Sequence, residues 1–488
     1  MLTLLCLSVC TADPEAVLAA RRRDLVDTFR TEMARVLDRA EAAGAASLAA
    51  EARASLEAVD TVPEDPLGRR PEQARIREVG RPDAERLIEQ SLLKTRREFA
   101  AGLYRLARSS VTAGHPAAAF RMLEEVSRVD PDYGPARTKL GDQRVGDRWL
   151  TPFEALQDRR KNVWTDRFGW LPQAHIERYE SGDRFYRGTW MPAAEEIPRR
   201  RAQGDPWKVE TDHFVVASHH SLERAAALAG RLEDYFRFFR REYADLFDSP
   251  RMVGSLLESG PIATGRKFRI VDFANKDQYV RELVAKQPNV GISNGLYLSR
   301  DKTAYFFFRD DPNARPEETL YHEVAHQLLY EADKLTRTPG GTAHFWVVEG
   351  FPTYLESFEP GDDPIVGDID HIRLVKAREN ALEDGLSEPF LRVMSYGQRE
   401  FQRGDDIEQI AARYHQAAGL VHFFMHAEDG RYRPALMRYL REVYDVRTPR
   451  VTPLTKLVGL PPEEIDRRYR EYLIEMDRRS KFPVRTRQ

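Results

Sequence analysis

A long run of helix-forming residues near the start of the chain limits its fold more than any other feature. After Pro14 the sequence is rich in Ala, Arg, Glu and Leu and contains no Gly or Pro before Gly44, and a similar composition continues to about Asp60. This composition favours α-helix, and the break at Gly44 predicts a hairpin of two helices. With 488 residues the chain is too long for one ordinary domain, so further folding units are expected.

A second helical segment runs from about Pro82 to Val129, and part of it has the pattern of a tetratricopeptide repeat. If Pro131 is the closing proline, the repeat covers about residues 100–133. The positions at which the repeat requires large or small residues are then occupied by Leu103, Leu106, Ala107, Val111, Ala119, Leu123 and Ser127. Gly114-His115-Pro116 is the predicted turn between its two helices. Because one repeat cannot bury its own face, we expect it to stack on neighbouring helices within a helical region at 13–140. This region is also a candidate surface for a protein partner.

Three copies of a short pattern follow at 141–204. Each copy has Trp, then an aliphatic residue, then a small residue or Pro, as in Trp149-Leu150-Thr151-Pro152, Trp170-Leu171-Pro172 and Trp190-Met191-Pro192. The tryptophans are 21 and then 20 residues apart, which indicates short modules of strand plus helix. We interpret them as linker modules whose tryptophans serve packing, with a binding role as the alternative.

At Trp207 the pattern changes to strand followed by helix. Runs of β-branched and aromatic residues at 213–218 and 267–273 predict strands, each followed by a helical segment. Segments 295–298 and 303–308 flank four polar residues and predict a hairpin. From Pro316 to about Glu475 the pattern is mostly helical. We therefore predict an α+β fold that is predominantly helical.

One motif in this part of the chain contains residues that could bind a metal ion and act as a base. His322-Glu323-Val324-Ala325-His326 lies in a segment predicted to be helical, with Pro316 in its first turn. Residues four apart share one face of a helix, so His322 and His326 can present two imidazoles to one cation. Catalytic zinc takes three protein ligands and keeps a fourth position for water or substrate. Glu323 can take a proton from that water and deliver it to the leaving amine.

A third ligand is available 23 residues beyond His326, at Glu349 in Trp346-Val347-Val348-Glu349-Gly350-Phe351-Pro352-Thr353-Tyr354. With this segment the sequence resembles the gluzincins, zinc metallopeptidases whose third ligand is a glutamate on the next helix. It is most similar to the uncharacterised peptidase-MA-like branch, whose members are often secreted and joined to tetratricopeptide repeats. That branch has His-Glu-x-x-His and then Trp-x-x-Glu-Gly-Phe/Leu-Ala-x-Tyr. Here Pro352 replaces the small residue, and a proline beyond the first helical turn would bend the ligand helix.

The resemblance covers about Trp207 to Met476 and implies a metallopeptidase domain at 205–476, with a tail at 477–488. It implies a small mixed sheet followed by a helical subdomain, with the cleft between them. The edge strand of the sheet would contain Gly295, Leu296 and Tyr297 and would pair with an extended substrate. The zinc ion would be bound by the two histidines of the motif and Glu349, with Glu323 as the general base.

The family also has a tyrosine on a later helix, ahead of an apolar stretch, that stabilises the developing oxyanion. The segment from Tyr414 to Phe424 resembles that stretch, so we predict this role for Tyr414. Tyr396 and His415 are the alternatives, and Tyr414 could also serve only helix packing. His344, just before the Glu349 segment, is a candidate for a contact that orients a metal ligand.

Other histidines are interpreted without a metal. His422 and His426 stand four apart but have no adjacent base, so we expect packing or surface positions. His219-His220 precedes a predicted helix and is interpreted as a solvated turn.

The functional hypothesis is hydrolysis of peptide bonds in a peptide or protein substrate by zinc-activated water. One rival is a non-catalytic peptide-binding protein with a relic zinc fold. Another is an assembly scaffold that uses only the tetratricopeptide-like helices. Glu323 favours catalysis, because metal binding alone does not require a base.

The charge balance and the start of the chain bear on partners and location. Lys and Arg number 75 against 78 Asp and Glu, so no nucleic acid or anionic membrane is expected as a partner. Residues 1–12 form a short apolar run ending in small residues, which resembles a secretory signal without its basic start. We expect export to the periplasm or the exterior, with lipid anchoring at Cys10 as a less favoured alternative. No later apolar stretch approaches the roughly 20 residues of a membrane span.

Overall fold

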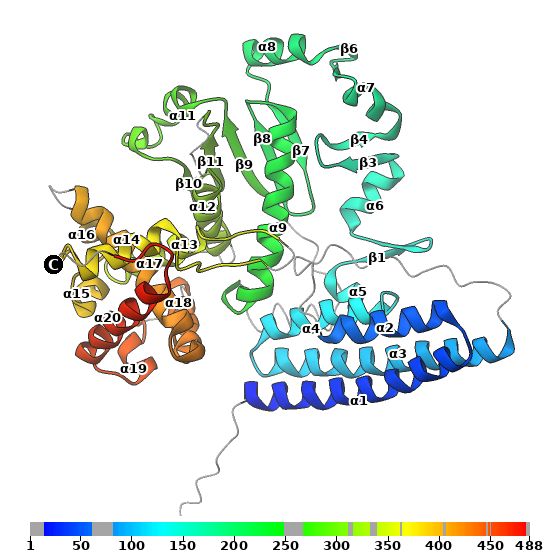
Figure 1. Ribbon diagram of the computed structural model, residues 1–488. Coiled ribbons are helices and arrows are strands. Elements are labelled where there is room, and N and C mark those ends of the chain that lie inside the picture. The colour runs from blue at the N-terminus through cyan, green and yellow to red at the C-terminus, as the bar shows by residue number, and fades with distance from the viewer. Residues whose placement is uncertain are drawn as a thin grey trace, which may run out of the picture. The chain divides into compact units, whose positions relative to one another are not determined.

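The computed structural model describes residues 14–60, 82–247, 267–310, 316–331, 339–361, 364–403, 407–445, 448 and 450–484. The predicted secretory signal, with Cys6 and Cys10, lies outside these residues. Over the described chain the fold is a predominantly helical α+β fold with one small mixed sheet, as predicted (Figure 1). The chain divides into two compact units. One contains the described residues up to Ala155 together with the end of helix α9 (Leu222–Phe247) from Arg237 onward. The other contains Leu156–Phe236 and the remaining described residues.

The first unit is built of helices that share one apolar core. The predicted hairpin is present as α1 (Pro14–Ala42) and α2 (Ala46–Asp60), and Gly44 between them has a positive φ of 68°. α3 (Asp83–Thr112), α4 (Pro116–Val129) and α5 (Gly134–Leu140) follow. All seven residues of the tetratricopeptide pattern are buried in α3 and α4. Since most of them lie in one cluster with residues of α1 and α2, the repeat packs on its neighbours as expected.

The three Trp patterns are three antiparallel hairpins, each followed by a helix. The elements are β1 (Gln143–Val145), β2 (Arg148–Leu150) and α6 (Pro152–Arg159); β3 (Asn162–Thr165), β4 (Gly169–Pro172), the 3-10 turn η1 (Gln173–His175) and α7 (Ile176–Glu180); and β5 (Asp183–Tyr186), β6 (Thr189–Pro192) and α8 (Ala193–Gln203). The prediction of strand-plus-helix modules is confirmed. Trp164 and Trp170 pack edge to face at 5.7 Å.

The second unit contains a five-stranded mixed sheet in the order β10-β11-β9-β8-β7. Its strands are β7 (Trp207–Glu210), β8 (Phe214–Ser218), β9 (Phe268–Phe273), β10 (Leu296–Leu298) and β11 (Thr303–Phe307). β8, β9 and β11 are parallel to one another, whereas β7 and β10 are antiparallel edge strands. The predicted hairpin is therefore β10 and β11, and β10 is an edge strand of the sheet as expected.

Side chains of β9 and β11 alternate between two faces of the sheet. Phe273, Tyr305 and Phe307 form a cluster with α11 (Lys276–Leu283) and the 3-10 turn η2 (Val290–Ile292). Ala304 and Phe306 occupy the alternate positions of β11 and are also buried. α9 (Leu222–Phe247) lies beside α12 (Pro316–Glu331), where the Tyr235 hydroxyl donates a hydrogen bond to the Tyr321 carbonyl at 3.1 Å.

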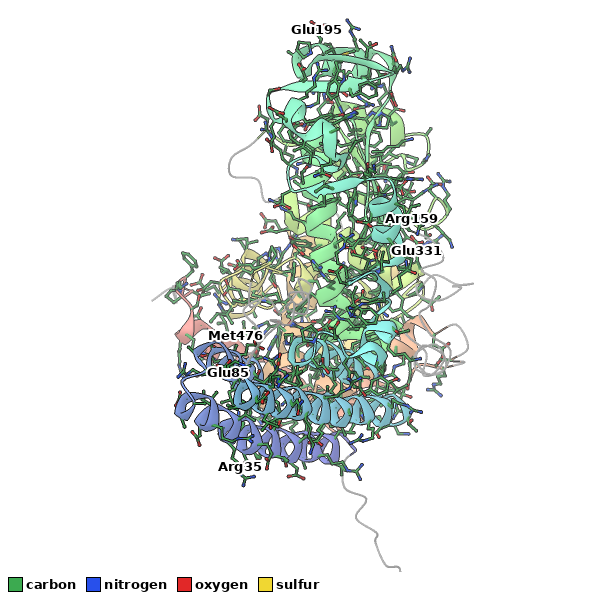
Figure 2. All side chains as sticks on the ribbon, turned by 90° about the vertical axis from the view of Figure 1, so that its right-hand side faces the viewer. Arg35, Glu85, Arg159, Glu195, Glu331 and Met476 are labelled. Carbon is green, nitrogen blue, oxygen red and sulfur yellow. The ribbon has the colours of Figure 1, made fainter. Side chains whose placement is uncertain are left out.

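The remaining helices form the predicted helical subdomain. They are α13 (Phe345–Leu355), α14 (Ile372–Leu382), α15 (Phe390–Ser395), α16 (Gln398–Phe401), α17 (Ile407–Gly430), α18 (Arg433–Tyr444), α19 (Leu454–Val458) and α20 (Pro462–Arg479). α17 is the central helix, because α13, α14, α18 and α20 all pack against it. Charged side chains such as Arg35 of α1 and Glu195 of α8 point away from the ribbon (Figure 2).

The two compact units meet between Ala155 and Leu156 and again between Phe236 and Arg237, whereas the sequence suggested a domain boundary at 204–205. The described Trp modules are shared between the two units, and the end of α9 belongs to the first. α20 also continues to Arg479, beyond the predicted end at Met476. Among the described residues, none of the helices combines the length and the apolar character needed to cross a membrane.

Candidate metal centre

Helix α12 presents the first two candidate ligands. It begins at Pro316 and continues to Glu331, so the whole His-Glu-x-x-His motif is helical. Leu320, Val324 and Leu328 are at most 2% exposed and anchor one face of the helix in the core. The helical repeat of 3.6 residues then aligns His322 and His326 along one partly exposed face.

Helix α13 presents the third candidate ligand. It begins after His344, which has a positive φ of 67°, and Glu349 is the only residue from Phe345 to Leu355 that is not buried. Gly350 lies against α17, because a Cβ there would be 2.8 Å from the Ala417 carbonyl oxygen. Pro352 lies inside the helix, past the first turn, and cannot donate a backbone hydrogen bond. The helix nevertheless continues to Leu355.

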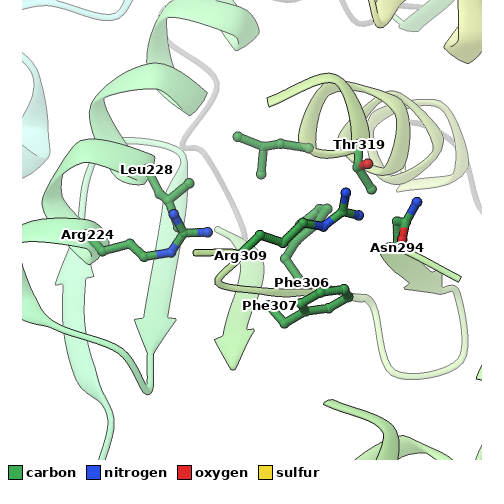
Figure 3. Close-up of a pocket in the computed structure, with 8 residues that line it drawn as sticks. Arg224, Leu228, Asn294, Phe306, Phe307, Arg309 and Thr319 are labelled. Carbon is green, nitrogen blue, oxygen red and sulfur yellow. The ribbon is translucent and has the colours of Figure 1, made fainter. Parts of the chain in front are cut away.

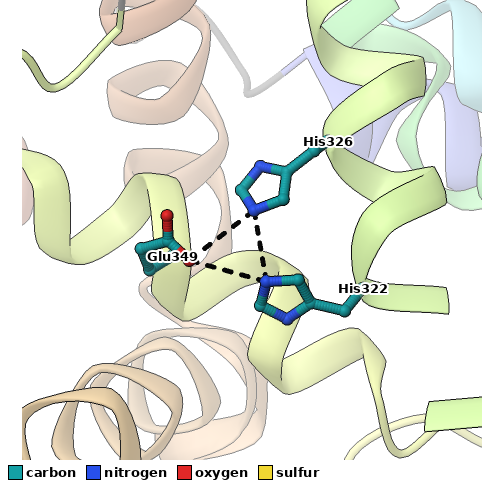
Figure 4. A group of neighbouring side chains, drawn as sticks. All are labelled: His322, His326 and Glu349. Atoms are coloured by element: carbon teal, nitrogen blue, oxygen red, sulfur yellow. Dashed lines mark hydrogen bonds and ion pairs between the residues drawn. The ribbon is translucent and has the colours of Figure 1, made fainter. Parts of the chain in front are cut away.

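The three predicted ligands converge on one point (Figure 4). The Nε2 atoms of His322 and His326 are 3.2 Å apart, and they lie 3.5 Å and 3.6 Å from Glu349 Oε2. Each side chain is about one-eighth exposed. In the part of the chain that the structure describes, no other group of His, Cys, Asp and Glu residues is close enough to hold a metal ion.

A second carboxylate orients the first histidine. Glu356 Oε1 accepts a hydrogen bond from His322 Nδ1 at 2.9 Å, which leaves Nε2 facing the other two ligands. Arg373 donates to Glu356 from Nε at 2.7 Å and from Nη2 at 3.3 Å. The carboxylate is therefore held from both sides in a buried position.

The charges of this cluster are strongly coupled. Burial disfavours the charged form of His322, but hydrogen bonds to Glu349 and Glu356 outweigh it and raise the pKa to about 10. Burial likewise opposes ionisation of Glu349, yet the two histidines hold the pKa of Glu349 well below its ordinary value. The carboxylate is thus ionised, as a metal ligand requires.

His344, the candidate for a contact that orients a metal ligand, contacts a residue outside the cluster. His344 Nδ1 lies 2.7 Å from the Tyr439 hydroxyl, and no hydrogen bond of the described residues joins His344 to the three ligands. The residue in contact with His322 is Glu356. Its position could have been read from the sequence, because seven residues are about two helical turns and place Glu356 on the same face as Glu349.

Glu323 lies beside the cluster and contacts the sheet edge. Its Oε2 accepts a hydrogen bond from the Tyr297 backbone N–H of β10 at 2.7 Å. Gly295, just before β10, allows close packing, because a Cβ there would be 2.7 Å from Thr319 Cγ2. The proposed base and the predicted substrate-pairing strand, Gly295 to Tyr297, are therefore adjacent.

The three candidates for the oxyanion donor lie in different surroundings. The Tyr414 hydroxyl accepts a hydrogen bond from Gln402 at 3.0 Å. Burial, together with the negative charges of Glu349 and Glu323, raises the pKa of Tyr414 above its ordinary value. The Tyr396 hydroxyl instead donates to Glu388, and His415 Nδ1 lies 3.2 Å from the Asn380 amide. Of the two tyrosines, Tyr414 is the one whose pKa reflects these two carboxylates.

Two further tyrosines near the cluster were not anticipated. The Tyr330 ring lies 6.3 Å from that of His326 and 5.8 Å from that of Tyr444, at the end of α18. Burial and the charge of Glu349 raise the pKa of Tyr330 to about 12. The i,i+4 spacing from His326 is a sequence signal that could have pointed to Tyr330, whereas nothing in the sequence points to Tyr444.

His422 and His426 form hydrogen bonds with other parts of the protein. His422 contacts the Gly367 carbonyl at 2.9 Å and the Tyr472 hydroxyl at 2.8 Å, while His426 contacts the Tyr354 hydroxyl at 2.8 Å. Their ring nitrogens are thus engaged within the protein, in agreement with a packing role.

His219 and His220 lie in a bend before α9 and are partly exposed, and each ring also packs against a phenylalanine. The His219 ring stacks on Phe273 at 5.5 Å, and the His220 ring lies 3.9 Å from Phe308.

The cluster fits a zinc ion by the chemistry of its donors. Two imidazole nitrogens and one carboxylate oxygen, all within 4.8 Å of one another, match the donor types that catalytic zinc sites use when they keep a fourth position open. Comparison of the sequence with protein-family models and with curated proteins finds no match.

Proposed function

We propose that this chain is a zinc-dependent hydrolase of peptide bonds. One observation carries the proposal: His322, His326 and Glu349 converge from two helices, and Glu323, next to the first ligand, is hydrogen-bonded to the edge strand β10. A metal site with no catalytic purpose would not need that carboxylate. A zinc ion held by the three side chains would supply Lewis acidity, which activates water for attack on a carbonyl at neutral pH.

The protein's own residues supply the proton transfer. In this proposal Glu323 takes a proton from the attacking water and returns it to the leaving amine. The hydrogen bonds that His322 and Arg373 donate to Glu356 hold the imidazole in one tautomer and orientation. Tyr414 is the proposed donor to the oxygen on which negative charge develops.

The edge strand makes a peptide the preferred substrate class. In the described part of the chain, β10 pairs with β11 on one side and with no strand on the other, where an extended peptide could add as a further strand. The outward N–H of Tyr297 is engaged by Glu323, so a peptide that pairs there competes with that hydrogen bond. Substrate pairing and positioning of the base are therefore coupled.

Metal analysis of the full chain tests the zinc site. We expect one zinc per chain, removed by a chelator and lost in His322→Ala and in Glu349→Ala. The matched control is His115→Ala, since His115 precedes α4 in the helical unit and makes no side-chain capping hydrogen bond. Unchanged zinc content in His322→Ala would reject the assignment.

A second variant separates catalysis from binding. Glu323→Gln should keep the zinc and abolish hydrolysis of any peptide that the wild-type protein cleaves. Equal activity of the two proteins would reject Glu323 as the base. A zinc-loaded wild-type protein that binds peptides but cleaves none would favour the peptide-binding alternative.

A further inference from the structure

A pocket at the carboxyl end of β11 contains Arg309, whose buried Nη2 atom has no hydrogen-bond partner (Figure 3). The residues that matter here are Arg224 and Leu228 of α9, Asn294, Phe306 of β11, Arg309, and Thr319 of α12. All of them belong to the second unit. The Arg309 guanidinium points toward Thr319, with Asn294 beside it. We call this site the Arg309 pocket.

The guanidinium of Arg309 is incompletely satisfied. Its Nη2 atom is buried and has no hydrogen-bond partner. Among the described residues, this side chain makes one cation–π contact, with the ring of Phe307, whose centroid lies 5.2 Å from Cζ, and no hydrogen bond or ion pair. A buried N–H of a charged group without an acceptor is unfavourable, so the pocket lacks an acceptor that a ligand could supply.

The charge of the pocket selects the ligand. Arg224 is already neutralised, because its Nε and Nη2 donate to the two oxygens of the buried Asp272 at 2.8 Å and 2.9 Å. Arg309 therefore supplies the one uncompensated charge among the described lining residues. The Asn294 amide and the Thr319 hydroxyl add neutral donors. One positive charge with a planar pair of N–H groups matches a carboxylate better than a doubly charged phosphate.

The Arg309 pocket adjoins the start of the edge strand β10 and the helix α12, which contains Glu323. Asn294 precedes Gly295, and a Cβ on Gly295 would lie 2.7 Å from Thr319 Cγ2. Thr319 in turn stands four residues before Glu323, so both lie on the same face of α12. The pocket is thus next to the amino end of β10, on the strand that the proposed function assigns to the substrate.

We propose that Arg309 binds a carboxylate of the peptide substrate. The inference rests on the proposed function, because it assumes that a peptide pairs with β10. The carboxylate is either the C-terminus of the peptide or the side chain of an Asp or Glu. If it is the C-terminus, the peptide runs antiparallel to β10, since its carboxyl end lies at the amino end of the strand.

Peptide binding to the full chain tests the proposal without requiring turnover. The probes are three fluorescently labelled hexapeptides of otherwise neutral composition: one with a free C-terminal carboxylate, one amidated, and one amidated with a single internal Glu. Fluorescence anisotropy gives Kd with chelator-treated protein and with zinc-loaded Glu323→Gln protein. The variants are Arg309→Gln and Arg309→Lys, and Arg281→Gln is the control because Arg281 is 67% exposed and pairs with Glu282.

We expect a carboxylate-bearing probe to bind at least about tenfold tighter than the neutral amide. Arg309→Gln should remove this preference, Arg309→Lys should keep part of it, and Arg281→Gln should leave it unchanged. The probe that shows the preference identifies the source of the carboxylate.

Equal binding of all three probes, or a preference that survives in Arg309→Gln, would overturn the inference. Circular dichroism and the Tm of each variant show that it is folded. Zinc stoichiometry and hydrolysis are scored separately, so a failure of the proposed function is distinguishable from a failure of the pocket.

Discussion

Gly350 of α13 lies in direct contact with the backbone of Ala417 of α17. A Cβ added to Gly350 would be 2.8 Å from the Ala417 carbonyl oxygen and 3.0 Å from the Ala417 Cβ. Gly350 follows Glu349 in the sequence, so this contact sets how closely the helix of the third ligand approaches the centre of the helical subdomain. The ligand position is therefore determined by packing of two helices that are distant in the sequence.

Gly350→Ala should destabilise the protein and weaken zinc binding. The added methyl group meets backbone that cannot rotate away, and such overpacking costs about 1–3 kcal/mol. Displacement of α13 would also move Glu349 away from the two histidines. Gly230→Ala is the control, because Gly230 lies inside α9 and a Cβ there meets no atom within 4 Å. That control should be about 0.5–1 kcal/mol more stable than wild type in chemical denaturation.

Glu356→Gln should lower zinc affinity by about 10–100-fold while leaving one zinc per chain at saturation. The amide keeps the shape of the carboxylate but not its charge, so His322 and Arg373 both lose a charged acceptor. Competition with a chromophoric chelator measures the affinity. Glu379→Gln on α14, where Glu379 pairs with the surface residue Lys376, should change nothing. An unaltered affinity in Glu356→Gln would contradict an orienting role.

Tyr414→Phe should keep the zinc and lower kcat by about 10²–10³-fold on any cleaved peptide. The expectation follows from the electrostatic influence of Glu349 and Glu323 on the Tyr414 hydroxyl. Tyr396→Phe serves as the control, since its hydroxyl donates to Glu388. If the two variants have the same kcat as wild type, Tyr414 serves packing.

Stability should fall as the pH is lowered from about 6.5. Burial, with the charge of neighbouring groups, lowers the pKa of His422 to about 3 and that of His426 to about 4 in the folded protein. The unfolded chain binds these protons near pH 6.5, so between the folded and unfolded pKa values it holds more protons than the folded protein. The contribution of the two neutral imidazoles to the free energy of unfolding is therefore fully present above pH 6.5 and decreases as the pH falls below that value.

The expected loss is about 1–2 kcal/mol per histidine between pH 7 and pH 5. Urea unfolding at the two pH values measures it. His426→Gln retains a partner for the Tyr354 hydroxyl but does not titrate, so its stability should depend less on pH than that of wild type. His115→Gln should show the wild-type dependence. A wild-type stability that is the same at pH 7 and pH 5 would contradict this account.

The sequence determined those parts of the protein that depend on local periodicity. The helix hairpin, the buried positions of the repeat in α3 and α4, the β10–β11 hairpin and the alignment of His322 with His326 all follow from spacings within one element. Glu349 was also selected from the sequence as the proposed third ligand, because it lies 23 residues beyond His326 in a segment that resembles the gluzincin pattern, and the structure brings it next to the two histidines.

Only the tertiary structure decided which side chains from different elements meet. Glu356 rather than His344 contacts His322, because α13 turns one face to α12 while His344, at its start, reaches α18. Likewise, Arg309 Nη2 has no acceptor among the described residues of its pocket, whereas Arg224 in the same pocket has Asp272. The physical reason is that periodicity fixes which residues share a face of a helix or strand, whereas long-range packing decides what each face contacts.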